Sequence, residues 1–211
     1  MTAGRSQALG NVRSFLVFRH GETDYNRNGR VQGWTDIPLN DAGLAQAAAL
    51  APLLLAHDVR SIVTSDLGRA HQTAVSAAGG RAVVLHRDMA LREIFYGELE
   101  GILFADLVAK LGDEFMAAWR HHDPAGLEQR IPTGESKREA LTRARDAIRR
   151  HAARVPVHET FAVSTHGGII RCLLATAEGG AAAPTKIRNC GAFRLTWDAA
   201  SDVFTYDGEL T

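Results

Sequence analysis

Short apolar runs alternate with helical patterns along most of the chain. Phe15-Leu16-Val17-Phe18 ends at a charged, glycine-bearing turn, and Ser61 to Ser65 and Phe161 to Thr165 have the same apolar character. Such runs are typical of strands buried on both faces in a parallel sheet. Further strands are expected over Arg81 to Leu85, Ile187 to Trp197 and Val203 to Tyr206.

The intervening helices have recognisable starts and stops. Asn40 has the position of an N-cap, and Pro52 should kink or end the helix that follows it early. The inward stripe of this helix is expected at Leu44, Ala47, Ala48, Ala51 and Leu55. A second helix should run from Asp66 towards Ala78, where Gly79-Gly80 stops it. Ser136-Lys137-Arg138-Glu139 has capping-box spacing, and the helix it starts should turn Leu141, Ala144 and Ile148 inward.

This alternation predicts an α/β fold, specifically a three-layer α/β/α sandwich with a largely parallel central sheet. The 211 residues suit one domain, with residues 1–13 as a flexible polar arm. Residues 97–132 are expected to form a small helical lid insertion of one or two short helices. Four arginines of the helix after Ser136 are interpreted as a solvated face, namely Arg143, Arg145, Arg149 and Arg150.

Composition narrows the function classes only slightly. The formal net charge is zero, so nothing global suggests a nucleic acid or an anionic membrane as partner. No apolar segment reaches the ~18 residues of a membrane span, and no secretory signal is recognisable. A cytoplasmic location follows by default. Cys172 and Cys190 lack metal-ligand spacing and are interpreted as buried, reduced thiols, although the sequence leaves a disulfide open.

Unusual polar residues follow three of the expected strands. Arg19-His20, Ser65 to Arg69 and Thr165-His166 each come directly after an apolar run. Ligand sites in open α/β sheets lie beyond the carboxyl ends of the strands. We therefore expect these residues to meet at one edge of the sheet.

Their types suit phosphoryl transfer to a histidine. The nucleophile must be a neutral imidazole, and nearby positive charge both binds phosphate and disfavours the imidazolium form. Arg19 and Arg69 can grip phosphate oxygens, His166 can add a donor, and Glu93 can protonate a leaving alkoxide. Taken singly, each residue has an ordinary structural interpretation.

The combination is much more specific. Four elements occur in order along the chain: Arg19-His20-Gly21-Glu22-Thr23 with Asn26, Ser65-Asp66-Leu67-Gly68-Arg69-Ala70, Leu91-Arg92-Glu93 with Glu100-Gly101, and Ser164-Thr165-His166-Gly167-Gly168. The chain thereby resembles the histidine phosphatase superfamily, which includes cofactor-dependent phosphoglycerate mutase, from Phe15 to Trp197.

The resemblance implies a role for each matching residue. His20 would be phosphorylated on Nε2, and Arg19, Arg69, His166 and the backbone N–H of Gly167 would bind the phosphoryl group. Glu93 would protonate the leaving oxygen and later activate water. Asn26 would also touch phosphate, whereas Gln32 and Tyr96 match substrate-contacting positions. No metal and no organic cofactor are implied.

The resemblance leaves the second half-reaction open. Attack by water makes a phosphatase, and attack by a bound phospho-acid makes a mutase. The segment from Gly101 to Gly134 is short and holds only Lys110, Arg120 and Arg130 as fixed cations. Together with Pro132-Thr133-Gly134-Glu135-Ser136, it favours the phosphatase branch. A phosphoglycerate mutase-type transfer is the alternative, and a non-catalytic phospho-ligand-binding module is a remote one.

The expected partner is a small phosphoester. Sugar phosphates, a phosphate of the alpha-ribazole type and phosphoglycerate-like acids are candidates. The pocket wall is expected at Phe95, Tyr96, Phe115 and Trp119, although Phe115 and Trp119 fit a lid core equally well. A homodimer is a family-level alternative that the sequence leaves open.

Overall fold

A six-stranded mixed sheet forms the centre of the molecule. The computed structural model describes residues 11–184 and 186–210. The strand order is β3-β2-β4-β1-β5-β6, in which the first four strands are parallel and β5 and β6 are antiparallel. The strands are β1 (Val12–Arg19), β2 (Ser61–Thr64), β3 (Val84–Arg87), β4 (Phe161–Thr165), β5 (Ala192–Asp198) and β6 (Val203–Glu209).

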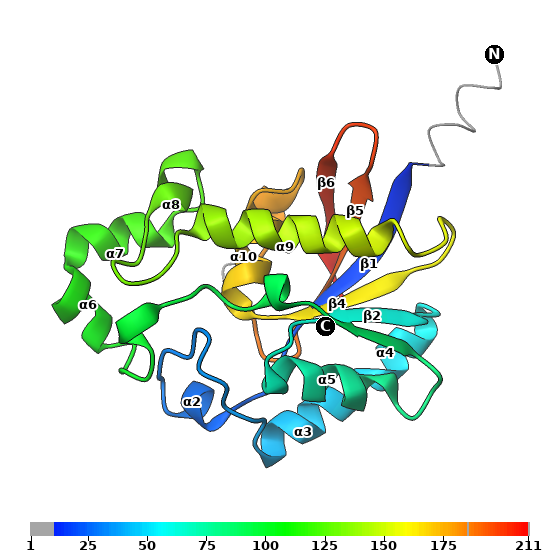
Figure 1. The fold of residues 1–211 in the computed structure, drawn as a ribbon, viewed down its shortest axis with the longest axis horizontal. Coiled ribbons are helices and arrows are strands. Elements are labelled where there is room, and N and C mark those ends of the chain that lie inside the picture. Colours follow the sequence, from blue (N-terminus) through cyan, green and yellow to red (C-terminus); the bar gives the residue numbers. More distant parts are fainter. Residues whose placement is uncertain (1–10, 185, 211) are drawn as a thin grey trace.

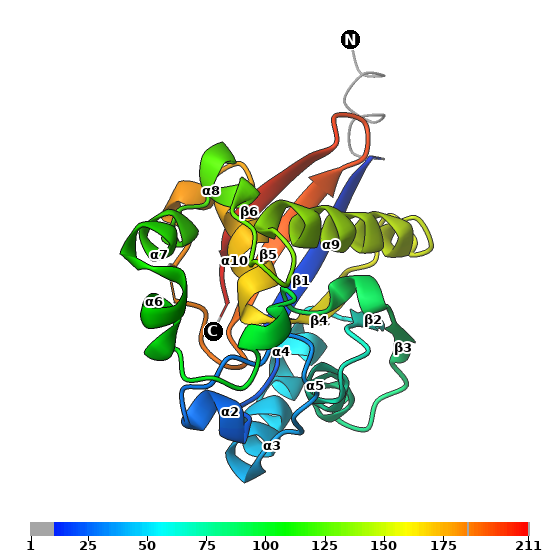
Figure 2. The ribbon, with the colours of Figure 1, turned by 60° about the vertical axis from the view of Figure 1, so that its left-hand side comes forward.

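Helices cover both faces of this sheet, as the sequence predicted (Figures 1 and 2). One face carries α3 (Asp41–Ala48), α4 (Ala51–Ala56) and α5 (Gly68–Ala78). The other carries α9 (Lys137–Ala152) and α10 (Gly167–Ala175). The α/β/α sandwich is therefore confirmed, and its parallel part contains the strands that precede the candidate site.

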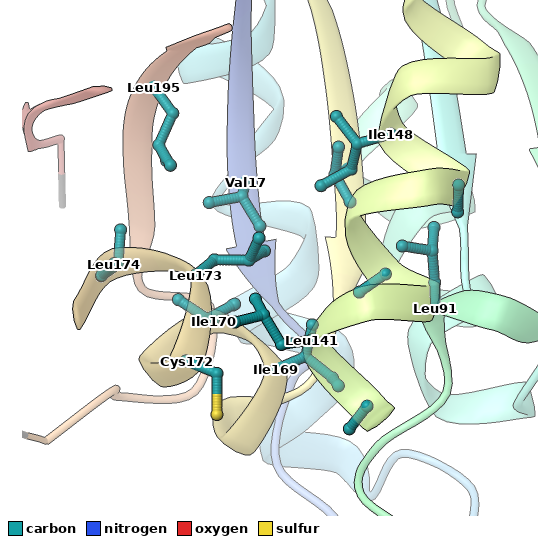
Figure 3. Close-up of a cluster of buried hydrophobic side chains, with 14 of the residues drawn as sticks. Val17, Leu91, Leu141, Ile148, Ile169, Ile170, Cys172, Leu173, Leu174 and Leu195 are labelled. Atoms are coloured by element: carbon teal, nitrogen blue, oxygen red, sulfur yellow. The ribbon is translucent and has the colours of Figure 1, made fainter. Parts of the chain in front are cut away.

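The central strand β1 is apolar throughout its middle because both of its faces are covered. Phe15 and Val17 point into the core beneath α9 and α10, whereas Leu16 and Phe18 pack against the helices of the opposite layer. Figure 3 shows Val17 between side chains of α9 and α10. Cys172 and Cys190 are buried thiols, and burial raises the pKa of each to about 12.

Most residues predicted to start or end a helix do so in the structure. Asn40 caps α3 by accepting the Gly43 N–H at 2.9 Å, and Ser136 forms the capping box of α9 with Glu139. Pro52 ends the first helix early because it begins a second one, α4. The β3 and β5 strands begin three and five residues later than predicted.

The predicted inward stripe of the first helix is largely wrong. Ala47 is buried as predicted, but Leu44 and Leu55 are 43% and 61% exposed, and Gly43 and Leu54 are buried instead. The reason lies outside the helix. Gly43 lies so close to the Glu22 backbone that a Cβ at this position would be 2.1 Å from the Glu22 carbonyl oxygen. That contact sets the rotation of α3.

The lid insertion contains three short helices rather than one or two. They are α6 (Asp106–Leu111), α7 (Asp113–Arg120) and α8 (Pro124–Glu128), and they lie together at one end of the molecule (Figure 1). The predicted arm falls mostly outside the described residues, but Val12 and Arg13 already belong to β1. No helix in the described part of the chain is long and apolar enough to cross a membrane.

Candidate active site

The carboxyl ends of β1 and β4 bring the two candidate histidines together. Arg19 is in register with Thr165, and the His20 N–H donates to the Thr165 carbonyl oxygen at 3.0 Å. The next residue after β4 is His166, whose ring centroid lies 5.2 Å from that of His20. The sheet-edge prediction is therefore correct for these residues.

His20 is held with one ring nitrogen engaged. Its Nδ1 lies 2.7 Å from the Gly21 carbonyl oxygen, which can only accept, so Nδ1 carries the proton and Nε2 keeps its lone pair. The side chain is buried. Burial lowers the pKa of His20 well below its usual range, and the positive charges of Arg69 and Arg19 lower it further. A neutral imidazole with an available Nε2 is the form that a nucleophile requires.

His166 is oriented from the neighbouring strand end. Its Nε2 lies 2.9 Å from the hydroxyl of Ser65, which follows β2. Its Nδ1 is buried and has no hydrogen-bond partner among the residues that the structure describes. Burial, and after it the charge of Arg69, holds the pKa of His166 well below the usual value. Ser65 was missed as a positioning group because the sequence did not reveal its contact.

Two arginines bring positive charge into the same space. Arg69 is fully buried, and its terminal nitrogens donate to the carbonyl oxygens of Thr35 and Gly33 at 2.9 and 2.7 Å. Burial lowers the pKa of Arg69 to about 10, so it remains a cation at neutral pH. Arg19 donates to the Ile187 carbonyl oxygen at 2.8 Å. The Nε atoms of both arginines are buried without a partner in the described structure, so each retains a donor.

The carboxyl group of Glu93 lies against the first turn of α10. Its Oε2 accepts the Gly168 N–H at 2.9 Å, and its Oε1 accepts that of Ile94 at 2.9 Å. A Cβ on Gly168 would lie 2.4 Å from Oε1, so this position needs glycine for close approach. The carboxyl group is therefore fixed within the same sheet edge as the two histidines.

Arg143 corrects the prediction of a solvated arginine face on α9. Its guanidinium donates to the backbone carbonyl oxygens of Ala90, Arg92 and Glu93 at 2.8, 2.6 and 2.8 Å. It also pairs with Glu135. Arg143 thus fixes the segment that carries Glu93. Of the four arginines only Arg150 is exposed, and its side chain pairs with Asp88. The spacing of charged residues gave no signal of this contact.

A cavity of about 60 Å³ is lined by six of the nine predicted site residues, namely Arg19, Asn26, Gln32, Arg69, Glu93 and Tyr96. The amide oxygens of Asn26 and Gln32 are engaged within the protein, by Asn189 and Thr23 respectively. Their amide N–H groups are therefore the atoms left for an anion. Burial raises the pKa of Tyr96, which keeps its hydroxyl protonated.

The aromatic wall differs from the prediction. Of the four expected residues, only Tyr96 lines this cavity. Trp119 packs edge-on against Tyr96 and stacks on Phe115, while Phe95 packs against Trp34. Phe104 of the lid lines the cavity instead.

Two polar residues to which the sequence assigned no role, Asn189 and Glu100, hold the backbone of the site in place. Asn189 donates to the His20 carbonyl oxygen at 3.1 Å. Glu100 accepts the backbone N–H groups of Trp34 and Thr35 at 2.8 and 2.7 Å, and so holds the loop whose carbonyl oxygens bind Arg69. The sequence motif contains Glu100 but does not reveal this contact.

Known proteins share both sequence and fold with this chain. The histidine phosphatase superfamily (branch 1) profile matches residues 15–205. A 2,3-bisphosphoglycerate-dependent phosphoglycerate mutase 2 of Gloeobacter violaceus is 36% identical over 163 residues, 75% of this chain and 73% of that protein. A probable phosphoglycerate mutase of Serratia proteamaculans is 32% identical and covers 93% of both chains. A mycobacterial glucosyl-3-phosphoglycerate phosphatase has a TM-score of 0.79 at 29% identity, over 93% of this chain and 98% of that one.

Proposed function

We propose that this chain, which belongs to the histidine phosphatase superfamily, hydrolyses phosphomonoesters of small metabolites through a phosphohistidine at His20. The observation that carries the proposal is the state of His20. Its Nδ1 is occupied by the Gly21 carbonyl oxygen, and the charges of Arg69 and Arg19 disfavour its protonation. The same arginines supply the donors that a phosphoryl group needs.

In the first step, His20 Nε2 attacks phosphorus. The N–P bond forms as the bond to the alcohol oxygen breaks, and Glu93 gives its proton to the departing alkoxide. Arg19, Arg69 and His166 bind the equatorial oxygens of the transferring group, whose charge they stabilise. The backbone N–H of Gly167 and the side-chain amide of Asn26 donate further hydrogen bonds to these oxygens.

In the second step, water replaces the alcohol. Glu93 accepts a proton from the water as its oxygen attacks phosphorus, and the N–P bond breaks with its electron pair returning to His20. Orthophosphate is released, and Glu93 is again protonated for the next turnover. Gln32 and Tyr96 line the side from which the alcohol part of the substrate enters.

Phosphoglycerate mutase-type transfer is the second candidate. The names of the Gloeobacter and Serratia relatives favour it. The name of the mycobacterial structure favours hydrolysis, as does the short lid with few fixed cations. A non-catalytic binding module is disfavoured because all five proposed catalytic positions carry the required residue types.

Phosphate release from a panel of phosphomonoesters tests the proposal. His20→Ala should abolish release, whereas His158→Ala, which alters an exposed histidine, should leave it unchanged. A quenched turnover should yield a phosphoenzyme that survives base and is lost in acid. Equal rates for His20→Ala and the wild type would contradict the nucleophile assignment. Transfer of labelled phosphate to a second phospho-acid in preference to water would identify a mutase.

A further inference from the structure

A buried lysine lies where α9 begins, next to the lid (Figures 1 and 2). Lys137 is the first residue of α9, and it is 1% exposed. The dipole of α9 opposes a cation at this end, and burial of a charge costs free energy unless other groups compensate it. The Lys137 ammonium group forms no ion pair in the described part of the chain. The mechanism above does not use this residue.

The compensating contacts come from the last turn of α7. The Lys137 Nζ donates to the Trp119 carbonyl oxygen at 2.6 Å and to the His121 carbonyl oxygen. It also lies 4.9 Å from the centroid of the Trp119 indole. The last carbonyl groups of a helix lack partners within the helix and form the negative end of its dipole, so a cation is stabilised there. Lys137 therefore caps the C-terminal end of α7 and fixes Trp119.

Trp119 connects Lys137 to the reaction cavity. Its ring stacks on Phe115 and packs edge-on against Tyr96, with the Trp119 and Tyr96 centroids 6.0 Å apart. Its indole N–H acts as a hydrogen-bond donor towards the Tyr96 hydroxyl and partly offsets the rise in pKa that burial causes. Because an indole nitrogen can only donate, the Tyr96 oxygen accepts, and the Tyr96 O–H remains available as a donor. Tyr96 lines the cavity that holds Glu93 and the two site arginines.

The backbone beside Tyr96 is fixed, so the ring is the part of this residue that a neighbour can orient. Gly97 has a φ of +54°, and a Cβ there would lie 2.3 Å from the Thr133 carbonyl oxygen, so only glycine fits this turn. The χ2 torsion of a tyrosine has broad minima, and a contact at the ring therefore decides where its hydroxyl lies. The edge-on contact with Trp119 supplies this restriction.

We propose that Lys137 is a positioning residue: by fixing Trp119, it holds the Tyr96 hydroxyl as a hydrogen-bond donor to an oxygen acceptor in the alcohol part of the phosphoester. This inference rests on the proposed function and names one feature that the site recognises in its substrate. Lys137 itself does not line the cavity and acts through the two aromatic residues. A site that hydrogen-bonds an acceptor discriminates against the analogue that lacks it, because its buried donor is then left unpaired.

Paired substrates test the hydrogen bond from Tyr96. Each pair consists of an n-alkyl phosphate of about four to seven chain atoms and its ether analogue, in which oxygen replaces one methylene group at a chosen position. The two members match in length and charge and differ in one acceptor. At the best position, wild-type kcat/KM should favour the ether analogue by about fivefold over the ratio seen in Tyr96→Phe, as expected for one neutral hydrogen bond. Tyr96→Phe is the baseline because differences between the leaving groups persist in it.

Two variants test the connection from Lys137 to Tyr96. Lys137→Met keeps the length of the side chain without its charge, and Trp119→Phe keeps an aromatic ring without its N–H. Each should reduce the ether preference at least about threefold, and Lys137→Met should not change the preference further in a Tyr96→Phe background. Lys110→Met removes an exposed charge from the same lid and should leave the preference unchanged. Rates on the alkyl phosphates report separately on the reaction centre.

Amide hydrogen exchange tests the contact with α7 without any substrate. Loss of the two hydrogen bonds from Lys137 should speed exchange in the last turn of α7 at least about tenfold in Lys137→Met. The same amides should exchange at the wild-type rate in Lys110→Met. Unchanged exchange in Lys137→Met would show that Lys137 does not fix Trp119 and would overturn the proposal.

The kinetic outcomes separate this proposal from the proposed function. An equal loss on both members of each pair in Lys137→Met would overturn the positioning role and leave a purely structural one. Phosphate release without any ether preference in the wild type, relative to Tyr96→Phe, would overturn the hydrogen bond from Tyr96 and leave the phosphatase intact. Absence of release from these pairs and from the phosphomonoester panel would count against the proposed function itself, and this inference with it.

Discussion

Two histidine pairs in this molecule have nearly the same geometry. The rings of His20 and His166 are 5.2 Å apart at 60°, and those of His86 and His151 are 5.1 Å apart at 63°. The pairs flank the same strand. His166 directly follows the last residue of β4, whereas His151 packs against its first residue, Phe161.

The resemblance extends to hydrogen bonds and proton affinity. His166 Nε2 lies 2.9 Å from Ser65, and His151 Nε2 lies 2.9 Å from Ser61. Each of these histidines has a buried Nδ1 without a partner in the described part of the chain. Burial lowers the pKa of both. A perturbed pKa and a histidine pair therefore do not by themselves identify an active site.

The surroundings distinguish the pairs. The first pair has Arg69, which is buried, and Arg19, which is partly buried, beside it. The second lies at edge strand β3, where His86 is exposed and the nearby Asp88 pairs with Arg150 on the surface. Fixed positive charge and a fixed carboxyl group make the first pair suitable for phosphoryl transfer, and we expect the second to be structural.

Substitution of the corresponding histidines should give the largest contrast. His166→Asn removes a phosphate donor and should lower kcat/KM about 10³-fold, in line with the loss of one donor to developing negative charge. His151→Asn should leave kcat/KM unchanged and reduce the free energy of unfolding. Steady-state kinetics and urea unfolding of both variants check this, and equal kinetic effects would remove the distinction between the pairs.

Acid should destabilise the folded protein through His151 of the second pair. The pKa of His151 falls from the ordinary 6.5 to about 4 on folding, chiefly through burial. The folded state thus binds fewer protons, so stability is lost as the pH falls from 6.5 towards 4. The change in the pKa of His151 accounts for about 3 kcal/mol of this loss in the free energy of unfolding. His151→Phe should show a correspondingly shallower loss in urea unfolding at pH 7 and 4.5, and a slope identical to that of the wild type would contradict this assignment.

Replacing arginine by lysine tests the role of the cations. Arg69→Lys keeps the charge but loses the planar fork that reaches two carbonyl oxygens and a phosphate, so kcat/KM should fall about 10²-fold. Arg154→Lys makes the same change near His151 and should have no kinetic effect. A similar loss in both variants would point to general destabilisation, which thermal unfolding would detect.

The serine partners should give the smallest difference. Ser65→Ala frees His166 to rotate and should lower kcat/KM about fivefold, the equivalent of one neutral hydrogen bond of ~1 kcal/mol. Ser61→Ala should cost similar stability without altering kinetics. Because Ser65 acts through His166, Ser65→Ala should have no further effect in a His166→Asn background. An additive loss in that double variant would show that Ser65 acts by another route.

Local signals explain what was predicted correctly in the fold. The bounds of β4 match the apolar run Phe161 to Thr165, and Asn40 and Ser136 cap their helices, because these features depend on neighbouring residues alone. The stripe of α3 failed because Gly43 contacts the backbone of Glu22 across a loop. No periodicity of the helix itself records that contact.

Residue types and the order of strands were enough for the sequence to place His20, Arg69 and His166 at one edge, since parallel strands end on the same side of a sheet. Only the tertiary structure decided which groups support them. Arg143 reaches the Glu93 segment across 50 residues of chain, and Lys137 at the start of α9 holds the end of α7 in the lid. Such contacts arise from packing between distant elements, and it is packing that buries the cations beside one histidine pair and leaves those near the other exposed.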